Sequence, residues 1–156
     1  MTAQRLRVVV LVDGHHTDEL VDLLSRLVAL DQAEVVFVYV FGEAPRAGLE
    51  MVSHRPGGHH LPAERERVIE EAEQARGGDA LAEAERLAGP RAAAVRSIRA
   101  HGKPGQAVCE LAAREAADLV VVRAGGRDRP PIGPHSLGPA ARFISDHSPC
   151  PVLLIR

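Results

Sequence analysis

Four short runs of apolar residues, most of them β-branched or Leu, constrain this chain more than any other feature of its sequence. Each run is nearly continuous instead of alternating with polar residues, which is typical of strands covered on both faces of a parallel sheet. The runs are Leu6 to Val12, Ala33 to Val40, Leu119 to Val122 and Val152 to Ile155. Helical segments separate them, so the pattern predicts an α/β fold with right-handed crossovers and helices on both faces of the sheet.

The segments between the strands show helical periodicity. Helices are predicted from Thr17 to about Leu30, from Pro62 to Ala88, through Val108 to Ala116, and onward from Gly138. The long second helix contains Gly77 and Gly78, each of which costs on the order of 1 kcal/mol relative to Ala. Its apolar positions nevertheless keep phase across the two glycines. We therefore expect one continuous helix whose buried face includes Val68, Ile69 and Leu81.

A weaker fifth strand completes the pattern. Ala92 to Ala100 carries Val95 and Ile98 among Arg and Ser residues, which suits the edge of a sheet. In an open parallel sheet the ligand crevice lies at the carboxyl ends of the strands, where the strand order reverses. Asp13 to His16 and Ala124 to Gly138 both follow strands at such ends. The second segment leads through glycines into a helix, so it predicts a phosphate-binding loop.

Composition excludes several other functions. The chain has 156 residues, 46% of them hydrophobic, and is expected to form one domain over residues 1–156. A net charge of −2 and an aromatic content of 3% give neither the attraction nor the stacking surfaces expected for nucleic acid. With no apolar run long enough to span a membrane and no signal segment, the protein is expected to be cytoplasmic, without membrane contact. Its two cysteines, Cys109 and Cys150, are too few for a disulfide framework.

Residues 41–61 form an irregular segment rich in Gly and Pro. It contains His54, His59 and His60, and a loop of this length within a compact domain is usually functional or mobile. A His-rich loop can bind a metal ion, but no Cys or carboxylate lies at ligand spacing here. Solvated surface is therefore the preferred interpretation, and no metal is expected.

Several short segments, taken together and in order, resemble the universal stress protein family. They are Val12-Asp13-Gly14, Ala33-Glu34-Val35, Gly102-Lys103-Pro104, Ala117 to Val122, and Ser148-Pro149-Cys150-Pro151 before the last strand. The resemblance covers nearly the whole chain apart from residues 41–61. It implies a five-stranded parallel sheet of order 3-2-1-4-5, Rossmann-like and similar to the adenine nucleotide alpha-hydrolases. It also implies binding of ATP or AMP and a homodimer formed through Val152 to Ile155.

The loop after the fourth strand departs from the family pattern, which is Gly, two residues, Gly, nine residues, Gly and then Ser or Thr. Counting back from the chain end places Gly125 and Asp128 at the first two glycines and Pro139 at the hydroxyl; counting forward from the strand places Arg123 and Gly126 at the glycines. Pro139 offers neither a hydroxyl nor an N–H. The remaining glycines allow close backbone approach, and nearby side chains can supply donors. The predicted nucleotide-binding residues are Val12, Asp13, Val40, Gly125, Gly126, Arg127, Ser136 and Gly138.

Two interpretations of Asp13 stay open. The resemblance implies that it faces the adenine end of a nucleotide, whereas an Asp-Gly pair also favours a turn in which Asp binds its own backbone. For the whole chain, we expect an adenine-nucleotide-binding stress-response module that acts as a homodimer. The alternatives are a protein-interaction dimer that has lost the nucleotide and a cAMP-binding member, which needs only one phosphate. Dedicated catalysis is not expected, because no activated nucleophile or metal cluster is recognisable; slow ATP hydrolysis is the one activity left open.

Overall fold

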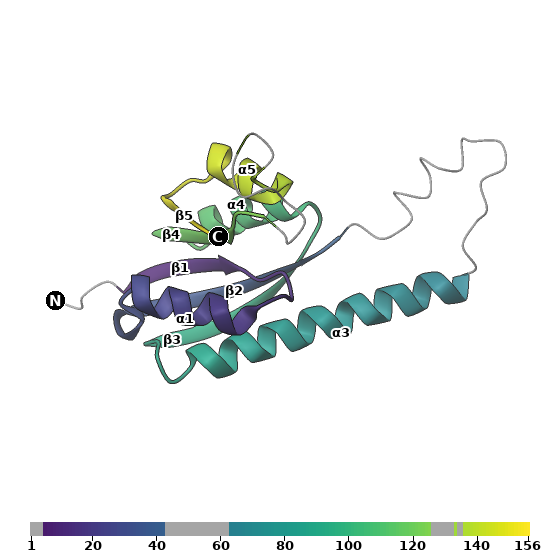
Figure 1. Cartoon of the computed structure of the whole chain (residues 1–156), viewed down its shortest axis with the longest axis horizontal. Helices are drawn as coiled ribbons and strands as arrows, with labels where there is room; N and C mark the ends of the chain where they lie inside the picture. The colour runs from purple at the N-terminus through teal and green to yellow at the C-terminus, as the bar shows by residue number, and fades with distance from the viewer. Residues whose placement is uncertain (1–4, 43–62, 126–132, 134–135) are drawn as a thin grey trace.

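The computed structural model describes residues 5–42, 63–125, 133 and 136–156, which form a five-stranded sheet with helices on both faces (Figure 1). Neighbouring strands are all parallel, in the order β3-β2-β1-β4-β5. The strands are β1 (Leu6–Leu11), β2 (Ala33–Phe41), β3 (Ala94–His101), β4 (Leu119–Arg123) and β5 (Val152–Ile155). The predicted α/β fold, its strand order 3-2-1-4-5 and the edge position of the weak strand are confirmed.

Two helices cover each face of the sheet. They are α1 (Thr17–Leu27) and α3 (Ala63–Ala88) on one face, and α4 (Pro104–Arg114) and α5 (Pro139–His147) on the other; η1 (Leu30–Gln32) leads into β2. Successive strand residues point to opposite faces. Val8 and Val10 therefore pack with α1 and α3, while Val9 packs with α4 and α5. The continuous apolar runs of the sequence follow from this, because both faces must be apolar.

Helix α3 is continuous across Gly77 and Gly78, as predicted. Gly77 is buried where the helix crosses the end of β2. A Cβ atom at this position would lie 2.6 Å from Cζ of Phe41 and 2.7 Å from Cδ1 of Tyr39. A glycine is thus required for the close approach of helix and strand, whatever it costs in helix propensity.

The expectation that Val68 and Ile69 lie on the buried face of α3 is wrong. Their side chains are 61% and 50% exposed. The first half of α3 extends beyond the sheet, so within the described part of the chain no strand lies beneath it (Figure 1). Ile69 lies eleven residues, about three turns, before the buried Ala80 and so shares its side of the helix, but periodicity cannot indicate where the sheet ends. Val68 lies about two and a half turns before the buried Gly77, so it is on the opposite side of the helix.

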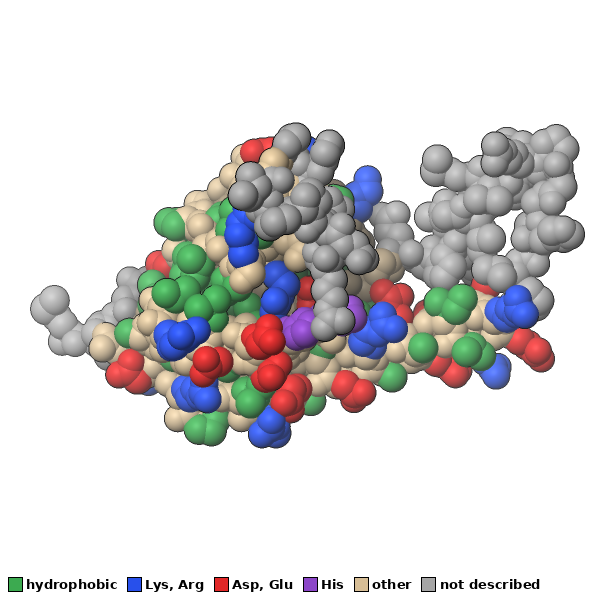
Figure 2. All heavy atoms as spheres, in the orientation of Figure 1, with side chains coloured by type: hydrophobic (Ala, Val, Ile, Leu, Met, Phe, Trp, Pro, Cys, Tyr) green, Lys and Arg blue, Asp and Glu red, His purple; other side chains and the backbone are tan. Residues whose placement is uncertain are grey.

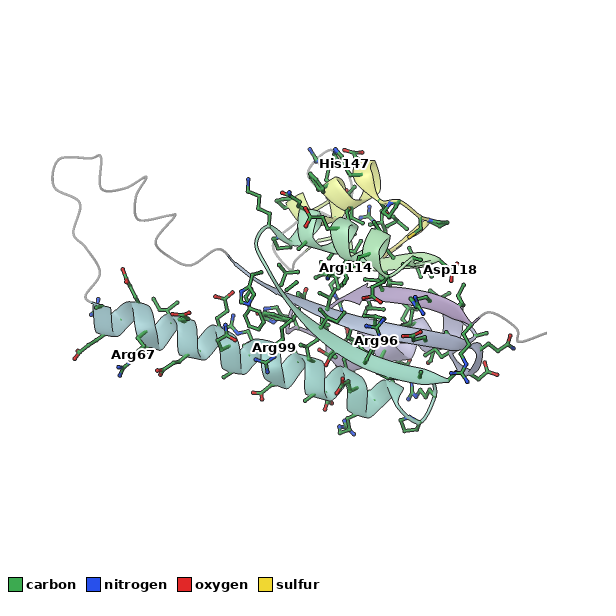
Figure 3. The ribbon with its side chains drawn as sticks, turned by 180° about the vertical axis from the view of Figure 1, so that it is seen from behind. Arg67, Arg96, Arg99, Arg114, Asp118 and His147 are labelled. Carbon is green, nitrogen blue, oxygen red and sulfur yellow. The ribbon has the colours of Figure 1, made fainter. Side chains whose placement is uncertain are left out.

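A network of ion pairs connects β1, β2 and β3 near the amino ends of β1 and β2. Glu34 accepts hydrogen bonds from Nη2 of Arg7 at 3.0 Å and from Nε of Arg96 at 2.9 Å. Arg96, labelled in Figure 3, also pairs with Glu115 at the end of α4. Hydrogen bonds from Arg96 lower the pKa of both glutamates. The network therefore holds both carboxylates in their charged form.

Two kinds of feature are absent from the described residues, a membrane-spanning helix and a metal-binding cluster. None of their helices has the length and apolar character needed to cross a membrane. They also contain no cluster of three or more His, Cys, Asp or Glu residues suited to a metal ion. His54, His59 and His60 lie outside these ranges, as does the predicted irregular segment beyond its first two residues.

Candidate functional site

A cavity of about 320 Å³ lies at the carboxyl ends of β1, β2 and β4, where the strand order reverses. Its lining residues are Leu11, Val12, Asp13, Tyr39, Val40, Pro104, Val122, Arg123, Gly125, Gly138, Pro139, Ala140 and Ala141. The volume is near the lower limit of the roughly 300–1,000 Å³ typical of small-molecule sites. The cavity occupies the position expected for the ligand crevice of such a sheet.

The exit of β1 forms one wall. The N–H of Val12 donates to the carbonyl of Val38 at 2.9 Å, so the sheet pairing continues one residue past the strand. Oδ1 of Asp13 accepts the N–H of His15 at 2.9 Å, which is the turn-forming arrangement that Asp favours. Asp13 also lines the cavity, and the turn uses only Oδ1, so it is compatible with a ligand contact through Oδ2. Figure 2 shows histidine side chains between acidic and basic ones where β1 leads into α1.

The end of β2 contributes Tyr39 and Val40, and both line the cavity although successive strand residues point to opposite faces. Burial raises the pKa of the Tyr39 hydroxyl, and the carboxylates of Glu73 and Asp13 raise it as well, while Arg76 acts in the opposite direction. The hydroxyl therefore stays protonated at neutral pH. It can donate a hydrogen bond beside the cavity.

Arg123, the last residue of β4, is the only Lys or Arg among the described residues that line the cavity. Its Nη2 donates to the carbonyl oxygen of His16 at 3.0 Å, which ties the end of β4 to the start of α1. A guanidinium has five N–H donors, so this bond leaves capacity for an anionic group. Arg123 is absent from the predicted set. The sequence did contain a signal for it, namely a basic residue directly after a buried apolar run, at the strand end where ligands bind.

The entrance of α5 forms the opposite wall. The N–H of Gly138 donates to the carbonyl of Ala124 at 2.7 Å, and Pro139 has no N–H. Ala140 and Ala141 follow in the first turn, where helix geometry provides no intrahelical acceptor for the backbone N–H. Both residues line the cavity, so their N–H groups are the backbone donors that this helix can present to an anion.

The structure brings together most of the predicted binding residues. Val12, Asp13, Val40, Gly125 and Gly138 line the cavity. Ser136 is buried, with 8% of its surface exposed, and is not among the described lining residues. Gly126 and Arg127 lie outside the described residues, as does Asp128. The lining residues outside the predicted set are Leu11, Tyr39, Pro104, Val122, Arg123, Pro139, Ala140 and Ala141. Those at the entrances of α4 and α5 reach the cavity only because these helices pack against the strand ends.

Comparison with known proteins places this geometry in context. The sequence pattern of the universal stress protein family matches residues 5–156, while no curated protein matches the chain. Universal stress protein UspA from Lactobacillus plantarum is 22% identical with a TM-score of 0.69, over 99% of this chain and 100% of that one. A universal stress protein in complex with cAMP is 22% identical with a TM-score of 0.62, over 99% and 98%. A family protein from Arabidopsis thaliana with AMP bound is 16% identical with a TM-score of 0.65, over 96% and 90%. At such identities the three structures show a shared fold.

Proposed function

Because this chain belongs to the universal stress protein family, we propose that it is a stress-response module that binds an adenine nucleotide at the carboxyl ends of β1, β2 and β4. The observation that carries the proposal is the cavity between Asp13 and the entrance of α5. The Asp13 carboxylate offers an acceptor for the N–H or O–H groups of adenosine. On the opposite wall, the N–H groups of Ala140 and Ala141 and the guanidinium of Arg123 offer donors to phosphate. Two of the relatives described above hold AMP and cAMP.

The entrance of α5 favours a ligand with one phosphate. The N–H of Gly138 is engaged by Ala124 and Pro139 has none, so these two positions offer no backbone donor to further phosphate groups. The volume of about 320 Å³ also suits a small ligand. AMP is therefore the first candidate, cAMP the second, and ATP is expected to bind more weakly. The proposed role is binding, not dedicated catalysis.

A thermal-shift titration with AMP, cAMP, ATP and adenosine tests this proposal on protein stripped of nucleotide. A ligand at 100 times its Kd stabilises the folded state by about 2.7 kcal/mol. For a chain of this size that corresponds to a rise in Tm of about 5–11 °C. The rise should be largest for AMP or cAMP. If none of the four raises Tm at millimolar concentration, the nucleotide proposal is rejected and the protein-interaction dimer takes its place.

Asp13→Asn separates the two roles of this residue. Oδ1 of the amide still accepts the N–H of His15, so the turn is kept, but an N–H₂ donor replaces the second oxygen. We expect the nucleotide-dependent rise in Tm to fall by more than half. The Tm of the variant without ligand should stay within about 2 °C of wild type, because a surface substitution that keeps the turn changes stability by less than about 0.5 kcal/mol. Asp31→Asn is the matched control, because Asp31 is exposed in η1 and does not line the cavity. An unchanged nucleotide response in Asp13→Asn rejects the ligand role of this carboxylate.

We also propose that the module forms a homodimer through β5. This strand is the last in the sheet and pairs with β4 on one side. Leu154 is 38% exposed, and an apolar edge strand invites pairing with a second copy. Leu154→Lys should shift the molar mass measured by light scattering from dimer toward monomer. An unchanged mass, or a monomeric wild type, rejects this interface without affecting the nucleotide proposal.

A further inference from the structure

The first half of α3 carries apolar side chains that no described strand covers. We call the stretch Ala63 to Arg76 the arm, because burial against the sheet begins only at Gly77. It spans about four turns, or about 21 Å at 1.5 Å per residue. Val68 and Ile69, near its middle, are 61% and 50% exposed. Figure 2 shows hydrophobic side chains open to view along this part of the helix, with acidic and basic ones beside them. These two adjacent apolar side chains are available for contact with another molecule.

The charges on the arm follow a simple pattern. Residues four apart form rows along a helix, and these rows are the ridges that pack against another helix. One row consists of Arg65, Ile69 and Glu73; the next consists of Glu64, Val68, Ala72 and Arg76. Each row is apolar in its middle and carries opposite charges at its two ends. A surface with this arrangement is complementary to itself when it is turned end to end.

We propose that a second copy of this chain binds the arm, with the two helices antiparallel about a two-fold axis near Ile69. In this arrangement Arg65 lies opposite Glu73 of the second copy, and Ile69 packs against its own counterpart. The neighbouring row then places Glu64 opposite Arg76 and Val68 opposite Ala72. A parallel pairing in register would instead put like charges together. A two-fold interface requires one patch to contact itself, and both rows meet that requirement.

The position of this axis agrees with the dimensions of the arm. Its midpoint falls between Ile69 and Glu70, so two arms centred there overlap along their whole length. Each arm then ends where the sheet of the other copy begins. A groove between the start of α1 and α3, lined by Gly14, Thr17, Ala72, Ala75 and Arg76 among others, continues the same side of the helix. The first helical turn of the second copy would lie at this groove.

The arm pairing is distinct from the dimer proposed through β5. Helix α3 packs against β2 and β3, at one edge of the sheet, whereas β5 forms the other edge. A copy bound at the arm therefore does not cover β5, and a copy bound at β5 does not cover the arm. Two four-turn helices bury less than the roughly 1,600 Å² of a standard interface. We expect the arm pairing to depend on protein concentration, and also on salt, because exposed charge pairs are screened.

Cysteine cross-linking of the full chain tests the axis directly. Ile69→Cys places a thiol beside its counterpart, so oxidised glutathione should convert this variant to a disulfide-linked dimer on a non-reducing gel. Arg67→Cys is the matched control, since Arg67 lies about 160° around the helix from Ile69. Figure 3 shows Arg67 pointing away from the rest of the molecule. Wild-type protein controls for Cys109 and Cys150. If Ile69→Cys cross-links no faster than Arg67→Cys, the proposal is overturned.

A charge exchange then tests the register. In the Ile69→Cys background, Arg65→Glu should slow cross-linking several-fold, because Glu then faces Glu73. Adding Glu73→Arg should restore the rate, and 1 M salt should reduce the difference between the variants. Circular dichroism verifies that each variant keeps its helix content. An unchanged rate with Arg65→Glu, or no recovery in the exchanged pair, overturns the antiparallel arrangement. So does a rate that Leu154→Lys abolishes, since the cross-link would then depend on the dimer through β5.

Discussion

Replacing Gly77 by Ala gives the sharpest test of how α3 is seated on the sheet. The new Cβ atom would lie 2.6 Å from Cζ of Phe41 and 2.7 Å from Cδ1 of Tyr39, well inside the 3.4 Å at which ordinary contact begins. Phe41 is 2% exposed and Tyr39 is 7% exposed, so neither ring can retreat into solvent. Overpacking costs about 1–3 kcal/mol, and two buried rings place this variant in the upper part of that range, about 2–3 kcal/mol, while Ala gains about 1 kcal/mol in helix propensity. We expect a net loss of about 1–2 kcal/mol and a fall in Tm of about 2–8 °C.

The neighbouring Gly78→Ala is the matched control. Its Cβ atom would meet Nη2 of Arg99 at 2.9 Å, and this is the far end of a flexible side chain. The propensity gain should therefore dominate, leaving stability unchanged or raised by up to about 1 kcal/mol. Urea unfolding followed by circular dichroism measures both variants. If Gly77→Ala is as stable as Gly78→Ala, the close contact between α3 and β2 is not present in solution. Because Tyr39 lines the cavity, Gly77→Ala should also weaken nucleotide binding.

Two further predictions concern the other face of the sheet. Arg96→Met removes the cation between Glu34 and Glu115, so the free energy of unfolding at pH 7 should fall by about 1–2 kcal/mol, a modest value because these side chains are partly exposed. Arg96 lowers the pKa of both carboxyl groups in the folded state, so its contribution to stability is present above their unfolded pKa and is lost as pH falls through their folded pKa. The difference in unfolding free energy between Arg96→Met and wild type should therefore shrink below about pH 4.5. Urea unfolding at pH 7 and at pH 3 measures this difference. Gly105→Ala would place a Cβ atom 2.7 Å from Cβ of Phe143 and so force α4 and α5 apart. We expect this variant to lose about 1–3 kcal/mol of stability, and an unchanged Tm would contradict the close contact between the two helices.

The sequence predicted the architecture because burial on both faces leaves a direct record in the chain. The continuous run from Val8 to Val10 exists because alternate residues face different pairs of helices. The weak strand around Val95 and Ile98 is mixed in composition because it lies at an edge. Such patterns are local, so they can be recognised without knowing which segments meet. The strand order, in contrast, came from the family resemblance and not from the pattern.

The candidate site was only partly predictable. Asp13 and Gly138 were expected because they follow a strand and precede a helix, which are local signals. Arg123 and Ala140 enter the cavity because the end of β4 and the entrance of α5 meet there. The N–H of Gly138 donates to the carbonyl of Ala124, which weakens the case for a triphosphate. The spacing of glycines in the sequence cannot reveal this contact.

What the sequence determined by itself is the set of elements, because a helix or strand is selected by the residues within it. Only the tertiary structure decided how far α3 projects, since Ile69 and Ala80 lie about three whole turns apart on one side of the helix and differ in whether a strand lies beneath them. It also decided that Gly77 had to be a glycine, because the rings of Phe41 and Tyr39 come from a strand far away in the chain. Packing partners come from distant parts of the chain. For this physical reason, periodicity predicted which side of a helix is apolar but not which residues pack against it.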